Sequence, residues 1–265
     1  MRLAILITAA AVLSAKSYSV DGVVVATDIA AHTMLVAHRP IAGYMGAMVM
    51  PFRVQESNDL NGLNPGARIT FELVVEKDHS LARKVRKAGG GDVEIPPPPE
   101  RLNVGDRLAD FELNDQQGRR VRLEDFQGRV IAVNFIYTRC PLPDVCPRLS
   151  ANFAALARRF ERELGRDLAL LSVTVDPEYD TPVVLAEYAA RWRAGSSGWY
   201  FLTGDVKRLA AQLGEVYWAE EGSIGHNSVT SVISRDGRLA ARVPGAGYRV
   251  DQLQALIAHE LEKPR

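Results

Sequence analysis

One short segment divides the chain by composition and limits the folds open to it. Residues 88–100 read Ala-Gly-Gly-Gly-Asp-Val-Glu-Ile-Pro-Pro-Pro-Pro-Glu. Glycines let the backbone flex, whereas consecutive prolines form a stiff, extended spacer. We therefore predict a linker over residues 87–100 that joins two folding units, residues 18–86 and residues 101–265.

The overall charge of the chain is balanced. Its 265 residues include 32 basic and 32 acidic side chains, so the formal net charge is zero. This balance provides no bulk attraction for nucleic acid, which we exclude as a partner. The apolar fraction of 47% is typical of a globular protein.

The N-terminus has the pattern of an export signal. Arg2 precedes an apolar or small-residue run over residues 3–13, and Ala15-Lys16-Ser17 offers a small-x-small cleavage site. The run is shorter than the roughly 20 residues of a membrane-spanning helix. We predict a signal peptide over residues 1–17 and a periplasmic or otherwise exported protein. An uncleaved anchor, which would keep the chain near a membrane, stays open.

The first unit is predicted to be a small all-β barrel. Short alternating segments, separated by turns such as Asn64-Pro-Gly66, show no sustained helical period. These segments are residues 20–26, 34–37, 49–54 and 68–75.

The second unit alternates predicted strands with predicted helices. The strands are residues 130–137, 168–175, a short one near residue 200, and a hairpin of 229–234 with 239–243. The helices are residues 147–164, 181–193, 205–213 and 250–262. This order, with two cysteines after the first central strand, predicts an α/β thioredoxin-like fold.

Cys140 and Cys146, the only cysteines, lie at a predicted strand-to-helix junction. A helix N-terminus favours the thiolate, and so favours redox chemistry or metal binding. His226 is the best candidate for a third ligand, because the loop before the hairpin strand packs against the cysteine site in a thioredoxin fold. Two sulfurs and an imidazole suit copper as Cu(I) or Cu(II), with zinc as the rival. A stabilising disulfide is the alternative, since exported thiols tend to oxidise.

A methionine cluster marks the first unit. Apart from the initiator, every methionine lies between positions 34 and 50, and Met48 and Met50 fall on one face of a strand. With His38 they would form a soft site for Cu(I). The alternative is that methionines fill gaps in an apolar core.

Residues 101–263 resemble the Sco/SenC family of copper-binding thioredoxin-like proteins. Three ordered motifs carry the resemblance: Tyr137-Thr-Arg-Cys140-Pro with Cys146-Pro147, residues 173–182, and His226-Asn-Ser. It implies copper held by Cys140, Cys146 and His226, with Asp176 close to the metal. It also implies a role in assembling the binuclear copper site of cytochrome c oxidase. Five residues separate the cysteines here, whereas three are usual in the family.

Residues 19–78 resemble the small copper-binding domain called CusF-like. The resemblance implies an OB-type barrel and a Cu(I) site formed by His38, Met48 and Met50. The tryptophan of that family is missing from this unit. Met45 falls near its place and is a further candidate ligand.

Three functions follow from these patterns. The leading one is an exported copper metallochaperone, not an enzyme in the strict sense, that supplies a cytochrome c oxidase subunit or another copper protein. The second is a thiol–disulfide oxidoreductase that uses Cys140 and Cys146 on a copper-site subunit or assembly partner. The threonine two residues before Cys140, Thr138, is similar to the pattern in peroxidase relatives of the fold, so thiol-peroxidase activity also stays open. The third is copper sequestration by the first unit.

Overall fold

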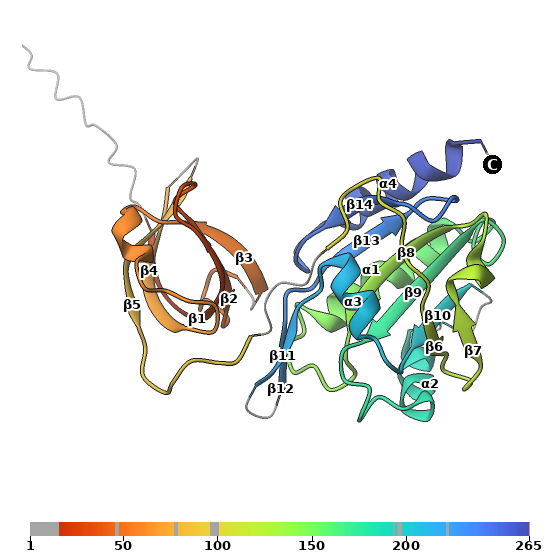
Figure 1. Cartoon of the computed structure of the whole chain (residues 1–265), viewed down its shortest axis with the longest axis horizontal. Helices are drawn as coiled ribbons and strands as arrows, with labels where there is room; N and C mark the ends of the chain where they lie inside the picture. Colours follow the sequence, from red (N-terminus) through yellow and green to blue (C-terminus); the bar gives the residue numbers. More distant parts are fainter. Residues whose placement is uncertain are drawn as a thin grey trace, which may run out of the picture.

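The computed structural model describes residues 16–45, 48–76, 79–95, 101–192, 194, 198–220 and 223–264. Figure 1 shows two units, one all-β and one α/β, and this confirms the predicted fold class. Residues 1–15 of the predicted signal peptide and residues 96–100 of the predicted linker lie outside the described residues. Within the described residues, no helix combines the length and apolarity that crossing a membrane requires.

The N-terminal β-domain is one curled antiparallel sheet. Its strands run in the order β3-β2-β1-β4-β5, and a bridge between Val54 and Ala82 joins the two outer strands. The sheet therefore bends round a shared core. The strands are β1 (Lys16–Asp28), β2 (Thr33–His38), β3 (Met48–Arg53), β4 (Arg68–Val75) and β5 (Ser80–Lys87), with the short helix η1 (Ser57–Leu60).

Burial alternates along β2, as expected for a strand with one face on a core. Met34, Val36 and His38 point inward, whereas Leu35 and Ala37 point to the other face. Strand β5 was not predicted, because its charged residues hide the alternation at the edge of the sheet.

The C-terminal domain is built on a second five-stranded sheet, in the order β10-β9-β8-β13-β14. Strands β8, β9 and β10 are parallel, and β13 is antiparallel to β8. Every residue of β8 and β9 is buried, as in a parallel sheet covered on both faces. The strands are β8 (Val130–Ile136), β9 (Leu168–Thr174), β10 (Trp199–Leu202), β13 (Thr230–Ile233) and β14 (Leu239–Val243).

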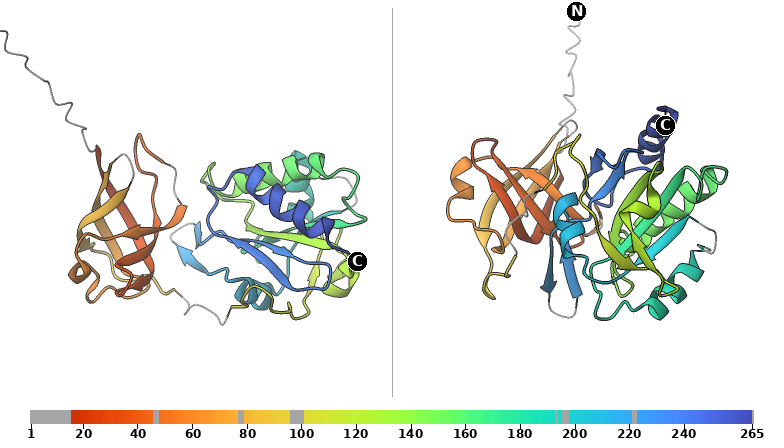
Figure 2. Two further views of the ribbon diagram at one scale, coloured as in Figure 1. Left: turned by 90° about the horizontal axis from the view of Figure 1, so that it is seen from above. Right: turned by 45° about the vertical axis from the view of Figure 1, so that its right-hand side comes forward.

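Four helices pack around this sheet, and α1 and α4 lie together on one face of it (Figure 2). The predicted first helix was too long: α1 ends at Arg159, because Phe160 leaves helical geometry and Leu164 bridges to Leu168. The helices are α1 (Cys146–Arg159), α2 (Pro182–Arg191), α3 (Lys207–Leu213) and α4 (Val250–Glu262).

Two short hairpins in this domain were not predicted. One pairs β6 (Glu112–Asn114) with β7 (Arg120–Arg122), and the helix η2 (Leu123–Phe126) follows it. The other pairs β11 (Tyr217–Glu220) with β12 (Ser223–His226), and it belongs to neither five-stranded sheet. Figure 1 shows β11 and β12 between the two domains. His226 therefore ends a strand and does not lie in a plain loop.

Candidate metal-binding sites

The two cysteines flank the loop that connects β8 to α1. Cys146 is the first residue of α1 and is fully buried, while Cys140 is half-buried at the domain edge. The loop folds back on itself: Val145 donates to the carbonyl of Leu142, whose oxygen lies 3.7 Å from Cys140 Sγ. Both cysteines are free thiols, and each is close enough to shift the pKa of the other. The five-residue spacing therefore still brings the two sulfurs together.

The two thiols have opposite acidities. The hydrogen bond from Cys146 is the main cause that lowers the pKa of Cys140 to about 6. Burial raises the pKa of Cys146, although that residue begins the helix. The expectation that the helix N-terminus produces the thiolate is therefore wrong for Cys146, because desolvation outweighs the helix dipole there. Cys140 is the thiolate and Cys146 is its proton donor.

His226 lies beside the buried cysteine. Its Nε2 is 3.7 Å from Cys146 Sγ, and its ring packs edge-on against Tyr137 with 5.9 Å between the centroids. The Tyr137 hydroxyl also accepts a hydrogen bond from the backbone of Ile224 in β12, and burial raises its pKa. Cys140, Cys146 and His226, predicted together, thus form a chain of neighbours centred on Cys146.

Glu215 fixes the orientation of the histidine. Its carboxylate is 2% exposed and lies 2.7 Å from His226 Nδ1. It also accepts hydrogen bonds from the backbone N–H of Ser228 (3.2 Å) and Val229 (2.7 Å). A carboxylate only accepts, so Nδ1 carries the proton and the Nε2 lone pair faces Cys146. Sequence reasoning missed Glu215, which lies 11 residues from His226 in a segment without a local motif.

The donor set fits a bound metal ion. With metal–sulfur and metal–nitrogen bonds of about 2.3 and 2.0 Å, two ligands of one ion lie about 3.5–3.8 Å apart. The Cys146–His226 separation of 3.7 Å meets this requirement. No three His, Cys, Asp or Glu side chains in the described part of the chain already form a complete cluster. Cys140 would therefore turn towards His226 on binding.

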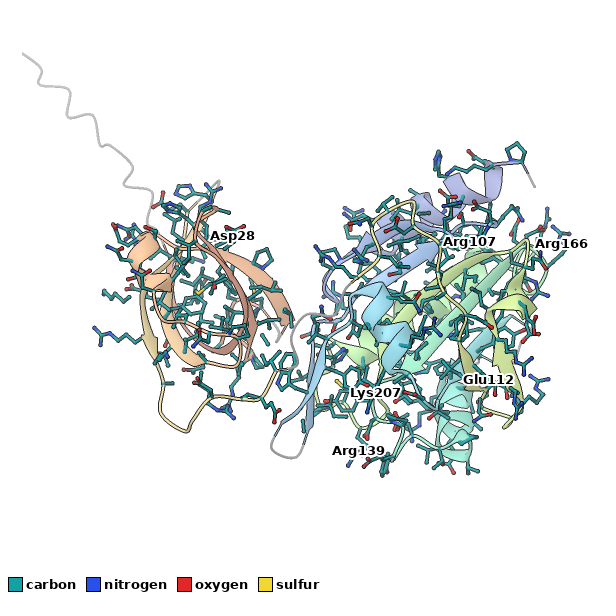
Figure 3. All side chains as sticks on the ribbon, viewed as in Figure 1. Asp28, Arg107, Glu112, Arg139, Arg166 and Lys207 are labelled. Carbon is teal, nitrogen blue, oxygen red and sulfur yellow. The ribbon has the colours of Figure 1, made fainter. Side chains whose placement is uncertain are left out.

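Two aspartates support the loop before Cys140 and do not contact the sulfurs. Asp180 is fully buried and accepts hydrogen bonds from Thr138 and Thr174, and burial raises its pKa. Asp176, predicted to lie close to the metal, pairs with Arg139 at 2.6 Å. Arg139 lies at the domain periphery (Figure 3). The Thr138 hydroxyl thus donates a hydrogen bond to Asp180.

The β-domain holds a second candidate donor set around His38. This residue ends β2 and is 3% exposed, with Nδ1 2.8 Å from the carbonyl of Arg39. Its Nε2 is buried and has no hydrogen-bond partner among the described residues. Burial lowers its pKa, so the neutral ring directs an Nε2 lone pair into the domain. A buried nitrogen of this kind is suited to bind a metal ion.

The methionines differ in burial and in their place in the strand register. Met45 and Met50 are half-buried and pack against the domain core. In the strand register Met48 pairs with His38 and Met50 with Val36, but the Met48 side chain lies outside the described residues. Met34 is wholly buried core. The core-filling interpretation therefore applies to Met34, and the structure leaves Met45 and Met50 as candidate ligands.

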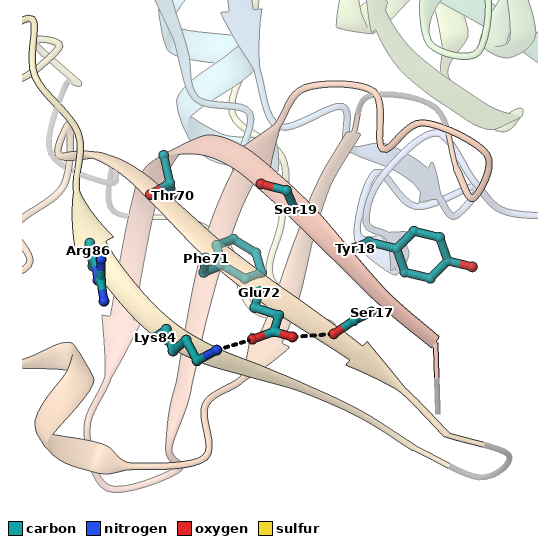
Figure 4. Close-up of a pocket in the computed structure, with 8 residues that line it drawn as sticks. All are labelled: Ser17, Tyr18, Ser19, Thr70, Phe71, Glu72, Lys84 and Arg86. Carbon is teal, nitrogen blue, oxygen red and sulfur yellow. Dashed lines mark hydrogen bonds and ion pairs between the residues drawn. The ribbon is translucent and has the colours of Figure 1, made fainter. Parts of the chain in front are cut away.

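A separate hollow lies on the outside of the β-domain, and the side chains that line it include no histidine, cysteine or methionine (Figure 4). Its carboxylate, Glu72, accepts a hydrogen bond from Ser17 and pairs with Lys84 at 2.9 Å. This carboxylate is therefore already paired within the protein.

Family models match both domains. Residues 101–262 match the model of SCO1/SenC, which is more than half of the chain. The chain belongs to the SCO1/SenC family. Residues 17–87 match the model of CusF, described as a copper binding periplasmic protein.

Individual relatives match parts of the chain. A Sco1 homologue of Bacillus subtilis is 35% identical over 36% of this chain and 47% of its own length. A protein of Stutzerimonas stutzeri named for copper binding is 30% identical over 60% of this chain and 78% of its own. The bovine mitochondrial Sco2 homologue is 30% identical over 48% of this chain and 50% of its own length. The chain thus spans about half the length of two of these relatives.

Solved structures share the fold of the C-terminal domain. A SCO1/SenC family lipoprotein of Bacillus anthracis has a TM-score of 0.54 at 23% identity, and covers 62% of this chain and 98% of its own. BsSco, described as having a disulfide switch and belonging to the cytochrome c oxidase assembly proteins, has a TM-score of 0.53 at 25% identity. It covers 64% of this chain and 100% of its own. These matches confirm the thioredoxin-like Sco fold.

We expect Cys140 to react as a thiolate at acidic pH. In the reduced, metal-free protein its alkylation rate should rise with a midpoint near pH 6, where a free thiol would need about pH 9. Peptide mapping by mass spectrometry over about pH 4–9 measures both cysteines. Replacing the hydrogen-bond donor, Cys146→Ala, should move the midpoint upward. Faster alkylation of Cys146 than of Cys140 would contradict the assignment.

We expect Glu215→Gln to weaken metal binding at the cysteine pair. If the oxygen of a glutamine side chain accepts the hydrogen bond from the Val229 N–H, its amide N–H group faces His226. This group donates to Nδ1, so the imidazole proton moves to Nε2. The affinity for Co(II), read from its thiolate absorption bands, should fall about 10- to 100-fold. Glu187→Gln on the exposed face of α2 is the matched control. Unchanged affinity with an unchanged Co(II) spectrum would remove Glu215 from the site.

Proposed function

We propose that this protein is an exported copper metallochaperone with two copper-binding sites. The observation that carries the proposal is the Cys146–His226 pair, spaced at 3.7 Å and oriented by Glu215, with the Cys140 thiol nearby. Two sulfurs and one imidazole suit copper. Membership of the SCO1/SenC family and the copper-binding relative from Stutzerimonas stutzeri support the same cargo.

In this proposal Cys140, Cys146 and His226 are the ligands of the C-terminal site. Cys146 and His226 are buried and hold the ion, whereas half-buried Cys140 is the sulfur that an incoming or outgoing copper meets at the edge. Binding displaces the proton of Cys146 to solvent, because the thiolate is the metal ligand. Exchange of Cu(I) between sulfur ligands changes no oxidation state. The arrangement therefore suits stepwise handover to a partner's ligands.

The β-domain supplies the second proposed site, with His38, Met48 and Met50 as ligands and Met45 as a further one. Its buried, unpartnered Nε2 supports this assignment, since thioethers and a neutral imidazole form a soft site that favours Cu(I). The match to CusF, whose description includes copper binding, supports it independently. The site needs no thiol, so it would stay intact when the cysteines are oxidised.

The relatives support a proposal for where the copper goes. BsSco is described as a member of the cytochrome c oxidase assembly proteins, and CusF as periplasmic. We propose that this protein works outside the cytoplasm and delivers copper to the copper-site subunit of cytochrome c oxidase or to another copper protein. The apolar run over residues 3–13 supports export.

A second candidate is thiol–disulfide exchange, favoured by the unequal acidities of the cysteines. The Cys140 thiolate would attack a partner disulfide and release one partner thiol, and Cys146 would then attack the mixed disulfide and release the other. Two electrons pass to the partner, and the two cysteines end as a disulfide. This reaction requires neither His226 nor Glu215.

Counting copper tests the proposal. We expect the reduced full-length protein to bind two Cu(I) per chain under anaerobic conditions, because it has two independent donor sets. Each of the variants Cys140→Ser, Cys146→Ser and His226→Ala should lose the Cu(I) of the C-terminal site. His38→Ala should lose the Cu(I) of the β-domain, and His259→Ala, at an exposed position, should keep both. Oxidising the thiols should also remove only the Cu(I) of the C-terminal site. Elemental analysis after desalting measures the ratio.

Two results would contradict the copper proposal. One is a copper count that stays unchanged in Cys140→Ser, Cys146→Ser and His226→Ala. The other is metal-free exchange with a model disulfide that is rapid and unaffected by His226→Ala, together with no retained copper. The second result would establish the oxidoreductase instead.

A further inference from the structure

The β11–β12 hairpin has two different faces. Tyr217 and Ile224 pack against the core of the C-terminal domain. Because side chains alternate along a strand, His226 shares that face and Trp218 lies on the opposite one. The hairpin thus carries a proposed copper ligand on one side and a large aromatic ring on the other.

The Trp218 face is covered by the β-domain. Trp218 is 3% exposed and belongs to a cluster that joins the two domains. The members from the β-domain come from the outward positions of β1, β2 and β3, which we call the docking face. The cluster contains Val25, Leu35, Ala37 and Val49 from the docking face, Val216 and Trp218 from the hairpin, and Val93 and Ile95 from the connecting segment.

Gly225 brings this contact next to the metal ligand. It pairs with Trp218 across the hairpin, and a Cβ at position 225 would collide with the indole ring. The ring therefore lies against the backbone of the residue that precedes His226. Any movement of Trp218 acts directly on the strand that positions the histidine.

The contact between the domains is apolar. No hydrogen bond or ion pair found among the described residues joins one domain to the other. The indole N–H of Trp218 is likewise buried with no partner among them. An isolated two-stranded hairpin is marginally stable in water. The β-domain thus provides the second apolar layer that the hairpin needs.

We propose that the docking face of the β-domain binds the back of the β11–β12 hairpin through Trp218 and so holds His226 in its ligand position. Docking and metal binding at the cysteine pair are then linked, and each strengthens the other. The link rests on the proposed function only for the identity of the metal site. The docking itself is a property of the metal-free chain.

The test places a charge in the docking face of the full-length protein. Val25→Asp buries a carboxylate without a partner, so it should release the hairpin. Ile29→Asp, at an exposed position of the same domain, is the matched control. Leu35→Asp on the neighbouring strand is a second variant, and circular dichroism establishes that each protein is folded.

Two readouts separate docking from metal binding. With 5-fluorotryptophan at the three tryptophans, the ¹⁹F signal of Trp218, assigned through Trp218→Phe, reports its solvent exposure without metal. It should be protected in the unmodified protein and in Ile29→Asp, and exposed in Val25→Asp and Leu35→Asp. Co(II) affinity at the cysteine pair should fall about tenfold only in the two docking variants.

The outcomes distinguish the two proposals. A solvent-exposed Trp218 in the unmodified protein would overturn the docking. Exposure in both docking variants with unchanged Co(II) affinity would overturn the link to His226. A protected Trp218 in a protein whose cysteine pair binds neither Co(II) nor Cu(I) would leave the docking intact, overturn the link and remove the proposed function.

Discussion

The buried carboxylate of Glu215 is the interaction on which the candidate centre depends. It meets three donors, the Nδ1–H of His226 and the backbone N–H groups of Ser228 and Val229, so its charge is compensated inside the protein. The same contacts join the segment before β11 to the end of β12 and to the segment before β13. Removing the carboxylate would leave the histidine free to change tautomer and would unpair two backbone groups. Ligand geometry and local folding therefore rest on one side chain.

The two cysteines occupy environments that suit a site open on one side. Cys146 is enclosed by the core and holds its proton, while Cys140 is half-buried and acidic. The five-residue loop between them places Cys140 at the edge, with its sulfur 3.7 Å from the carbonyl oxygen of Leu142. Asp180 secures the approach to this loop through Thr138. A partner's ligands would reach Cys140 first.

The two domains bring donors of different chemistry into one chain. His38 and the methionines contain no ionisable thiol, whereas the C-terminal set requires two cysteines. Oxidation would thus act on one set and leave the other. The β11–β12 hairpin, which lies between the domains, carries His226 on one face and Trp218 on the other. This arrangement offers a physical route by which one domain affects the other.

Periodicity and motif spacing were sufficient for the fold class and the main helices and strands, because buried strands and amphipathic helices leave local patterns. The sequence also singled out Cys146 and His226, whose Sγ and Nε2 atoms lie 3.7 Å apart. Four features came only from the tertiary structure: the Glu215 contact, the unequal acidities of the thiols, the pairing of Asp176 with Arg139, and the burial of Trp218. Each depends on groups distant in sequence whose burial and separation are set by packing. Desolvation and hydrogen bonding act through space, so no local pattern encodes them.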